Sequence, residues 1–412
     1  MIRASILGSI HPFITSIGLT LTLTGCESSE APDTDMPPAI EARGDLISSE
    51  EILSLTRAEL QALVTQIGLP ELGEPQTGIH FHRLVYRTVD LDGQLSSASG
   101  MVVVPDGPGP FPMLSDQHGT QTRRRPTVTD PLRETELGGV ALLFASQGWM
   151  VASADYLGLG VSQGLHPYYH ADSAASATLD YLRSVRQFTD AQDIPLTDEL
   201  FLTGYSQGAH VTMALHRALE QEPTRDWNLI ASAPMAGAFD LADLSFPAAL
   251  TAPAPSSALY VAYILLAFDR VHDIFSAPAE VFQAPHDAQV EALFDGTRDL
   301  PQILAALPAT PAELLQPSFI ASYLEDEDHP LRALFRANEV LDWSPRAPIT
   351  LFHGRADVDV PFANAEHALE RLRARGATVE LVNVGDELDH ATASMPSYLG
   401  ARRWFELLRA AP

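Results

Sequence analysis

The chain has 412 residues, of which 46% are apolar and 19% are charged, so it carries enough material for one large enzyme domain with an insertion. The 53 acidic residues outnumber the 25 basic ones, and the formal charge of −28 argues against docking on nucleic acid or on an anionic membrane through a basic patch. Cys26 is the single cysteine, so a disulfide within the chain is excluded, and the composition fits neither a β-sandwich, a collagen nor a disordered chain.

Residues 1–25 have the pattern of a secretory signal peptide. Arg3 supplies a basic start, an apolar stretch follows, and small residues precede position 26. Residues 23–26, Leu-Thr-Gly-Cys, resemble the bacterial lipobox, which implies that Cys26 carries lipid as the first residue of an exported lipoprotein. The membrane is then a partner through this N-terminal anchor. Because Glu27 follows, and not an aspartate, the outer membrane or cell surface is favoured over the inner membrane. The alternative is an ordinary signal peptide with an incidental cysteine.

Residues 26–44 predict a flexible tether, because they are rich in Pro, Asp, Glu, Ser and Ala and show no apolar period. The folded domain is expected over residues 45–412. Ser48 and Glu51 have capping-box spacing ahead of apolar residues from Ile52 onward, which predicts that this domain begins with a helix.

A hairpin and then alternating strands and helices are expected after that helix. Residues 80–89 and 98–104 have strand patterns, and Asp92-Gly93 between them is a hairpin turn signal. From residue 111 onward strand and helix patterns alternate, which predicts an α/β protein with a mostly parallel sheet covered on both faces. The later strands are predicted over residues 111–114, 149–154, 199–205, 229–233, 349–352 and 379–384. Helices are predicted over residues 140–145 and 172–188, from 211 onward, and at the end of the chain.

Residues 199–210 contain an apolar strand that breaks into G-x-S-x-G at residues 204–208 and continues as a helix. This pattern nominates Ser206 as a catalytic nucleophile. A serine on a tight turn from strand to helix needs neighbours without side chains, so that its strained backbone fits and its hydroxyl stands clear. A structural serine in an ordinary turn is the alternative.

Four segments together resemble the α/β-hydrolase family, and more closely its secreted bacterial lipase and esterase branch. They are residues 204–208, His-Gly-Thr at 118–120, D-x-x-G-x-G-x-S at 155–162 and H-G-x-x-D-x-x-V-P at 353–361. The resemblance extends over roughly residues 78–408. It implies the α/β-hydrolase fold, with helices on both faces of a mostly parallel sheet and a helical cap inserted before the strand that bears the acid.

The family order of nucleophile, acid and histidine implies Ser206, Asp357 and His390 as the catalytic residues. In such a triad the imidazole takes the serine proton during attack, and the carboxylate fixes the tautomer of the imidazole. The motif favours Asp357, although Asp359 remains an alternative acid. His390 lies in a loop after the last strand, where the family places its base, and its alternative reading is a partly exposed loop histidine.

Two backbone N–H groups are expected to bind the oxyanion of the tetrahedral intermediate. Gln207 follows the nucleophile and supplies the first of them. The resemblance implies that the second comes from the loop that begins at His118, with Thr120 favoured. Because this loop departs from the H-G-G-G form of the family, Gly119 and His118 remain alternatives.

The strand pattern is interrupted at about residues 240–342, which resembles the cap of the family. Residues 259–268 predict an apolar helix that is too short to span a membrane, and the many prolines predict short broken helices around it. We expect a lid with an apolar inner face. The apolar face could bind an acyl chain or simply pack onto the core, and the sequence favours neither role over the other.

The motifs together predict a serine carboxylic ester hydrolase, an esterase or lipase, that works through an acyl-enzyme on a small-molecule or lipid ester. No metal-binding motif occurs in the sequence, and no metal or organic cofactor is expected. A serine peptidase or amidase on the same scaffold is one alternative, since fold and triad do not separate esters from amides. A catalytically silent binding module on a hydrolase fold is the other.

Overall fold

The computed structural model describes residues 42–68, 70–124, 135–221 and 227–410. The predicted signal peptide, Cys26 and nearly all of the predicted tether lie outside these residues. Within the described ranges, no helix combines the length and the apolar character that crossing a membrane requires.

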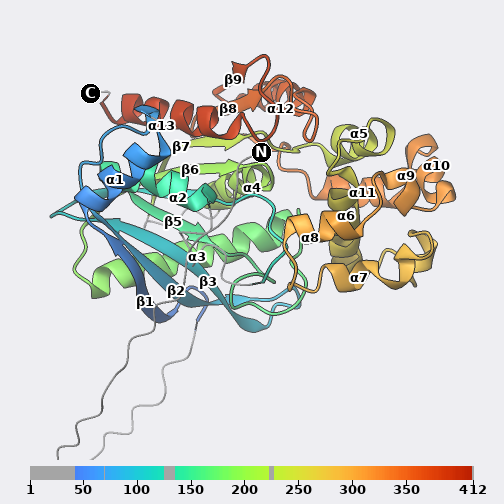
Figure 1. Cartoon of the computed structure of the whole chain (residues 1–412), viewed down its shortest axis with the longest axis horizontal. Helices are drawn as coiled ribbons and strands as arrows, with labels where there is room; N and C mark the ends of the chain where they lie inside the picture. Colours follow the sequence, from blue (N-terminus) through green and yellow to red (C-terminus); the bar gives the residue numbers. More distant parts are fainter. Residues whose placement is uncertain (1–41, 69, 125–134, 222–226, 411–412) are drawn as a thin grey trace, which may run out of the picture. The chain divides into compact units, whose positions relative to one another are not determined.

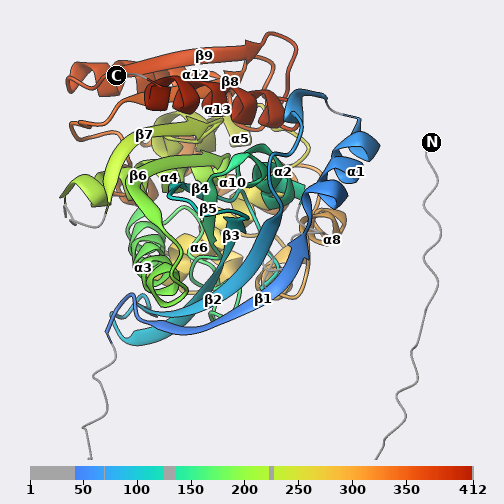
Figure 2. The same cartoon turned by 90° about the vertical axis from the view of Figure 1, so that its left-hand side faces the viewer.

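One sheet of nine strands runs through the described part of the chain, in the order β1-β2-β3-β5-β4-β6-β7-β8-β9. Figure 2 shows the strands following one another from β1 at one edge to β9 at the other. β1 to β3 and the β3–β5 pair are antiparallel, and the pairs from β5 and β4 through β9 are parallel. The strands are β1 Leu46–Leu55, β2 Ile79–Val89, β3 Leu95–Pro105, β4 Phe111–Gln117, β5 Met150–Ala154, β6 Leu196–Tyr205, β7 Asn228–Met235, β8 Ile349–Gly354 and β9 Val379–Gly385. The predicted α/β class with a mostly parallel sheet is confirmed.

Helices cover both faces of the sheet because the central strands are apolar on both sides. In β6, Leu200 and Leu202 pack in the cluster that includes α3 and α4, whereas Phe201 packs in the cluster that includes α1, α2 and α13. Neighbouring residues of a strand point to opposite faces, so this alternation buries both. These helices and α12, which packs on β9, are α1 Arg57–Ile67, α2 Thr135–Leu143, α3 Ala171–Ala191, α4 Gln207–Gln221, α12 Ala363–Ala374 and α13 Ser394–Ala410.

The prediction that the domain begins with a helix at Ser48 is wrong. Residues 46–55 form the edge strand β1, which pairs antiparallel with β2. The capping box lies eight residues later, where the Thr56 amide donates to the Glu59 carboxylate over 2.8 Å and the Glu59 amide donates to the Thr56 hydroxyl over 3.3 Å. A row of backbone hydrogen bonds to β2 outweighs the weak local signal at Ser48.

The segment between β7 and β8 folds into a cap of short helices. Figure 1 shows these helices gathered on one side of the sheet. Prolines stand in the first turn of several of them, a position where the missing N–H costs nothing. The elements are a π-helical turn at Leu241–Ser245 and helices α5 Phe246–Thr251, α6 Ser257–His272, α7 Val290–Leu293, α8 Leu300–Ala306, α9 Pro311–Leu314, α10 Pro317–Glu325 and α11 Pro330–Ala337.

Helix α6 forms the centre of the cap. All residues of the predicted apolar helix 259–268 are buried except Tyr260, and most of them pack within the apolar cluster of the cap. Tyr260, Val261 and Ile264 also line a pocket that reaches Ser206. The apolar stretch thus serves mainly to pack the cap, and three of its side chains face the candidate active site.

Candidate active site

Ser206 stands on a sharp turn between β6 and α4. Its φ is +57°, in the left-handed region that residues with a side chain rarely adopt. A methyl group on Gly204 would overlap the carbonyl oxygen of Gly208, and one on Gly208 would overlap that of Gln117, so both glycines are needed for this close approach. The Ser206 amide donates to the Met235 carbonyl oxygen over 2.9 Å, which ties the turn to β7. The serine is thereby presented at the carboxyl end of β6.

His390 and Asp357 reach Ser206 from the loops that follow β9 and β8. His390 Nε2 lies 2.9 Å from Ser206 Oγ, and His390 Nδ1 lies 2.6 Å from Asp357 Oδ2. Because a carboxylate only accepts hydrogen bonds, Nδ1 carries the hydrogen and Nε2 is left to accept the proton of the serine. The strands are parallel, so their carboxyl ends meet at one edge of the sheet. The structure therefore brings the three predicted residues into one hydrogen-bonded chain.

The Asp357 carboxylate is buried and accepts hydrogen bonds from three N–H groups. Besides the contact with His390, His353 Nε2 lies 3.1 Å from Oδ2, and the Val360 amide donates to Oδ1 over 2.8 Å. Burial raises the pKa of the Asp357 carboxyl, but the hydrogen bonds from His353 and His390 lower it by more than burial raises it. The pKa of Asp357 therefore lies below its ordinary value of 3.8. The site thus keeps Asp357 ionised.

Asp359, the alternative acid, lies in a different environment. Its Oδ1 accepts a hydrogen bond from the Ser256 hydroxyl of the cap, and its side chain lines the pocket under the cap. The structure gives Asp357, and not Asp359, the hydrogen bond to His390.

Local hydrogen bonds hold the loop that carries His390. The Tyr205 hydroxyl donates to the His390 carbonyl oxygen over 2.6 Å. The Asp389 amide donates to the Thr392 hydroxyl over 3.0 Å, and the Thr392 amide donates back to the Asp389 carboxylate over 2.9 Å. The imidazole is therefore held by its own loop as well as by its two partners.

The predicted oxyanion donors are Gln207, which follows Ser206 in the chain, and Thr120, which lines a cleft together with Ser206. Gln207 is the first residue of α4, and the first amides of a helix have no partner within it. Thr120 and Gly119 line the same cleft as Ser206. The Thr120 hydroxyl oxygen lies 2.6 Å from the Tyr168 hydroxyl oxygen, which fixes the side chain of Thr120 against the core. The loop at Thr120 therefore lies beside Ser206 at this cleft, and the N-terminus of α4 begins directly after Ser206.

The side chain of His118, the remaining alternative in that loop, is buried. Its ring nitrogens lie 2.8 Å from the Gly119 carbonyl oxygen and 3.3 Å from the Asp155 carbonyl oxygen, and the ring stacks on Tyr156 at 4.2 Å. Burial lowers the pKa of His118, so its ring is neutral at ordinary pH. The buried ring of His118 contacts the Gly119 carbonyl oxygen and so helps to hold its own loop in place.

The sequence places His166 at the cleft mouth or in ordinary loop anchoring, and the structure gives it an anchoring contact with the residue after Ser206. Its Nδ1 lies 2.8 Å from the Leu157 carbonyl oxygen and therefore donates, which leaves Nε2 to accept from the Gln207 side-chain amide over 2.6 Å. Burial lowers the pKa of His166 to about 3, so the ring stays neutral. The pair anchors the residue that follows the nucleophile, and no spacing signal links positions 166 and 207.

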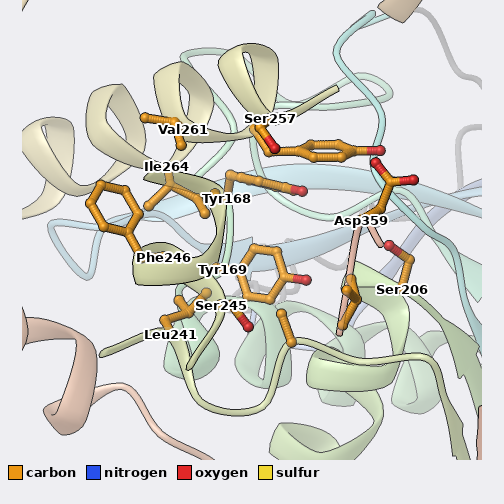
Figure 3. Close-up of a pocket in the computed structure, with 14 residues that line it drawn as sticks. Tyr168, Tyr169, Ser206, Leu241, Ser245, Phe246, Ser257, Val261, Ile264 and Asp359 are labelled. Carbon is orange, nitrogen blue, oxygen red and sulfur yellow. The ribbon is translucent and has the colours of Figure 1, made fainter. Parts of the chain in front are cut away.

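Two hollows meet at Ser206. The first, which we name the cap pocket, lies between the serine and helices α5 and α6 (Figure 3). The second, which we name the open cleft, holds about 320 Å³. The open cleft is lined by Gly119, Thr120, Tyr205, Ser206, Tyr260, Leu300, His390, Ala391 and Ser394. The cap pocket is lined by Tyr168, Tyr169, Ser206, Ala238, Leu241, Ser245, Phe246, Ala249, Ser257, Tyr260, Val261, Ile264, Asp359 and Val360.

Comparison with known proteins relates the whole described fold to solved hydrolase structures. No model of a known protein family matches the sequence, and no curated protein matches it. The structure of the rice cell wall degrading esterase LipA from Xanthomonas oryzae is 30% identical, with a TM-score of 0.80, over 89% of this chain and 98% of LipA. A candidate hydrolase from Legionella pneumophila is 28% identical with a TM-score of 0.82, over 89% of this chain and 98% of that one. Candida antarctica lipase A, at 17% identity, 86% and 79% coverage and a TM-score of 0.63, shares the fold.

Proposed function

We propose, on the premise that this chain belongs to the α/β-hydrolase family of the Xanthomonas oryzae esterase LipA, that it is a serine carboxylic ester hydrolase. The observation that carries the proposal is the hydrogen-bonded chain from Ser206 Oγ through His390 to Asp357, with distances of 2.9 Å and 2.6 Å. The solved relative named as an esterase, at 30% identity, supports the same class of substrate.

In the first half of the proposed reaction, Ser206 Oγ attacks the ester carbonyl carbon while His390 Nε2 takes the hydroxyl proton. The Asp357 carboxylate stabilises the imidazolium that forms, since it already accepts the hydrogen of Nδ1. The negative charge on the carbonyl oxygen is met by the Gln207 amide at the helix N-terminus and by an amide of the Thr120 loop, with Thr120 favoured. Loss of one such donor costs on the order of 100- to 1000-fold in rate.

In the second half, the tetrahedral intermediate collapses and the bond from carbon to the alcohol oxygen breaks. His390 gives its proton to that oxygen, the alcohol leaves, and the acyl group remains on Ser206. Water then attacks the acyl-enzyme, with His390 again taking the proton, and the carboxylic acid is released. The residues of this chain suffice for every proton transfer in the cycle.

The test is hydrolysis of p-nitrophenyl esters from acetate to palmitate by the protein and by Ser206→Ala. We expect the substitution to reduce turnover by at least about 1000-fold, because it removes the nucleophile. Equal turnover by both proteins would exclude Ser206 as the nucleophile. Cleavage of p-nitroanilides in preference to the esters would point to an amidase, and no turnover of either class, together with no labelling by a phosphonate, would point to a binding module.

We propose further that the protein is exported and anchored to the outer membrane or cell surface through lipid on Cys26. The support is the lipobox-like sequence at residues 23–26 and the tether-like composition of residues 26–44. Labelling cells with a lipid precursor tests this, with Cys26→Ser as the matched variant. Equal incorporation into both proteins would exclude the anchor.

A further inference from the structure

In the proposed function, on which this inference rests, His390 gives a proton to the leaving alcohol. The position of His390 therefore decides which hollow receives the acyl half of an ester and which receives the alcohol half. The proton for the leaving alcohol comes from His390 Nε2, and His390 lines the open cleft but not the cap pocket. The alcohol therefore leaves through the open cleft, and the acyl group takes the other hollow. Ser206 and Tyr260 line both hollows and stand at the junction between them.

The cap pocket has a polar mouth and an apolar end. In Figure 3 the side chains of Ser206 and Asp359 lie at one end of the pocket, which we call the mouth, and those of Phe246 and Ile264 lie toward the opposite end. The pocket holds about 40 Å³. On the same scale one water molecule needs roughly 10–15 Å³, so the space suits an acyl chain of only a few carbon atoms.

Asp359 brings a negative charge to this mouth. Ser256, the residue before α6, donates its hydroxyl hydrogen to Asp359 Oδ1 and so holds the carboxylate in place. Within the described residues, no arginine or histidine forms an ion pair with this carboxylate, so its charge is left uncompensated at the pocket mouth. The other polar groups of the pocket are hydroxyl groups of serine and tyrosine.

We propose that Asp359 selects the acyl group by charge. Because the pocket is short, the terminal group of a small acyl chain on Ser206 stays close to Asp359. The cap pocket therefore accepts short acyl groups that are uncharged or end in an ammonium group, and it rejects those that end in a carboxylate. Like charges a few ångströms apart at a half-exposed site repel strongly enough to change kcat/KM by about tenfold. Asp359 is two residues from the triad acid, but it acts on the substrate and not on His390.

The test compares kcat/KM for three ethyl esters, measured by release of ethanol. Monoethyl succinate carries the anionic acyl group, ethyl 4-methylpentanoate is its uncharged analogue of the same shape, and ethyl 4-aminobutyrate carries the cation. We expect the native protein to prefer the uncharged ester over monoethyl succinate by at least about tenfold. Asp359→Asn should reduce that preference by about tenfold and should also reduce the preference for the ammonium ester over the succinate.

Three further variants separate charge from structure. Asp359→Glu retains the charge and should retain the selectivity. Ser256→Ala removes the hydrogen bond to the cap while the carboxylate remains, and it should alter the rates for all esters without removing the charge preference. Asp198→Asn, which neutralises an exposed carboxylate at the far end of β6, should leave every rate within about twofold.

The outcomes that contradict the inference differ from those that contradict the proposed function. If the native protein hydrolyses none of the esters tested, including the p-nitrophenyl series, the proposed function fails. If it hydrolyses monoethyl succinate as well as the uncharged analogue, the inference is wrong without any variant being needed. If the native preference exists but Asp359→Asn leaves it unchanged, Asp359 does not set the preference and the inference is wrong.

Discussion

Substitution of Asp357 by Asn tests the electrostatic part of the proposed site. The carboxylate accepts hydrogen bonds from His390, His353 and the Val360 amide at 2.6, 3.1 and 2.8 Å. An asparagine side chain has one oxygen and an NH₂ group that cannot accept. If its NH₂ group faces His390, the imidazole must accept at Nδ1, and Nε2 then carries the hydrogen and no longer serves as a base. If the NH₂ group faces Val360, a buried N–H loses its partner.

Both orientations lower activity by a large factor. A neutral side chain also leaves the imidazolium of the transition state unpaired, so kcat should fall by about 1000- to 10,000-fold, or about 4–5.5 kcal/mol of transition-state stabilisation. Loss of one buried hydrogen bond should reduce the free energy of unfolding by about 1–3 kcal/mol. Hydrolysis of p-nitrophenyl butyrate and urea unfolding measure the two effects, with Asp198→Asn as the exposed control.

The same substitution has a pH signature. Because the pKa of Asp357 in the folded protein lies below 3.8, its contribution to stability is fully present above that value and is lost as pH falls through the lower, folded pKa. The loss of unfolding free energy in Asp357→Asn should therefore shrink in acid. If a folded Asp357→Asn protein retained more than about a tenth of the native kcat, the proposed dependence of His390 on the Asp357 carboxylate would be wrong.

Three further predictions concern the scaffold of the site. Gly208→Ala should reduce the free energy of unfolding by more than about 4 kcal/mol or prevent folding, because the added methyl group overlaps the Gln117 carbonyl oxygen; yield of soluble protein and urea unfolding measure this. Burial raises the pKa of Asp116 to about 6, so ionisation of this carboxyl at higher pH destabilises the folded protein. Asp116→Asn should therefore stabilise the protein by about 1–3 kcal/mol at pH 8, and by less as pH falls from 6 to 4. Calorimetry across this pH range measures the difference. Burial lowers the pKa values of His166 and His210 to about 3, whereas the unfolded chain binds these protons near 6.5, so the unfolding temperature should fall as pH drops from about 6.5 toward 3.

Each of these predictions has a contradicting result. A Gly208→Ala protein with native stability would mean that the turn relaxes easily. Equal stability of Asp116→Asn and native protein at pH 8 would mean that the buried carboxyl carries no penalty. For the histidines, an unfolding temperature that stays constant between pH 6.5 and 4 would mean that the folded protein binds those protons after all.

Features set by local sequence could be predicted well. The elbow at residues 204–208 is recognisable because two glycines, a strand and a helix must all occur within a dozen residues. Asp357 and His390 follow strands whose carboxyl ends meet at one edge, so their closeness to Ser206 follows once the sheet is known to be parallel. The hydrogen bonds that join them required the structure.

Features set by distant contacts could not be predicted. Residues 46–55 form a strand only because β2 lies beside them, and nothing local distinguishes Ser48 from the true cap at Thr56. The pairs of His166 with Gln207 and of Ser256 with Asp359 join residues 41 and 103 positions apart. Such pairs depend on how a loop or the cap folds back over the sheet, which no periodicity in the sequence records.

The most direct test of the proposed mechanism is mass spectrometry of the intact protein after reaction with a p-nitrophenyl alkylphosphonate, followed by peptide mapping. The phosphonate takes the place of the tetrahedral intermediate, so a nucleophilic serine held by His390 should acquire one phosphonyl group and lose esterase activity in proportion. We predict a single modification on the peptide that contains Ser206, and none in Ser206→Ala or at an appreciable rate in His390→Ala. Modification of another residue with full loss of activity, or full activity after complete labelling of Ser206, would contradict the account.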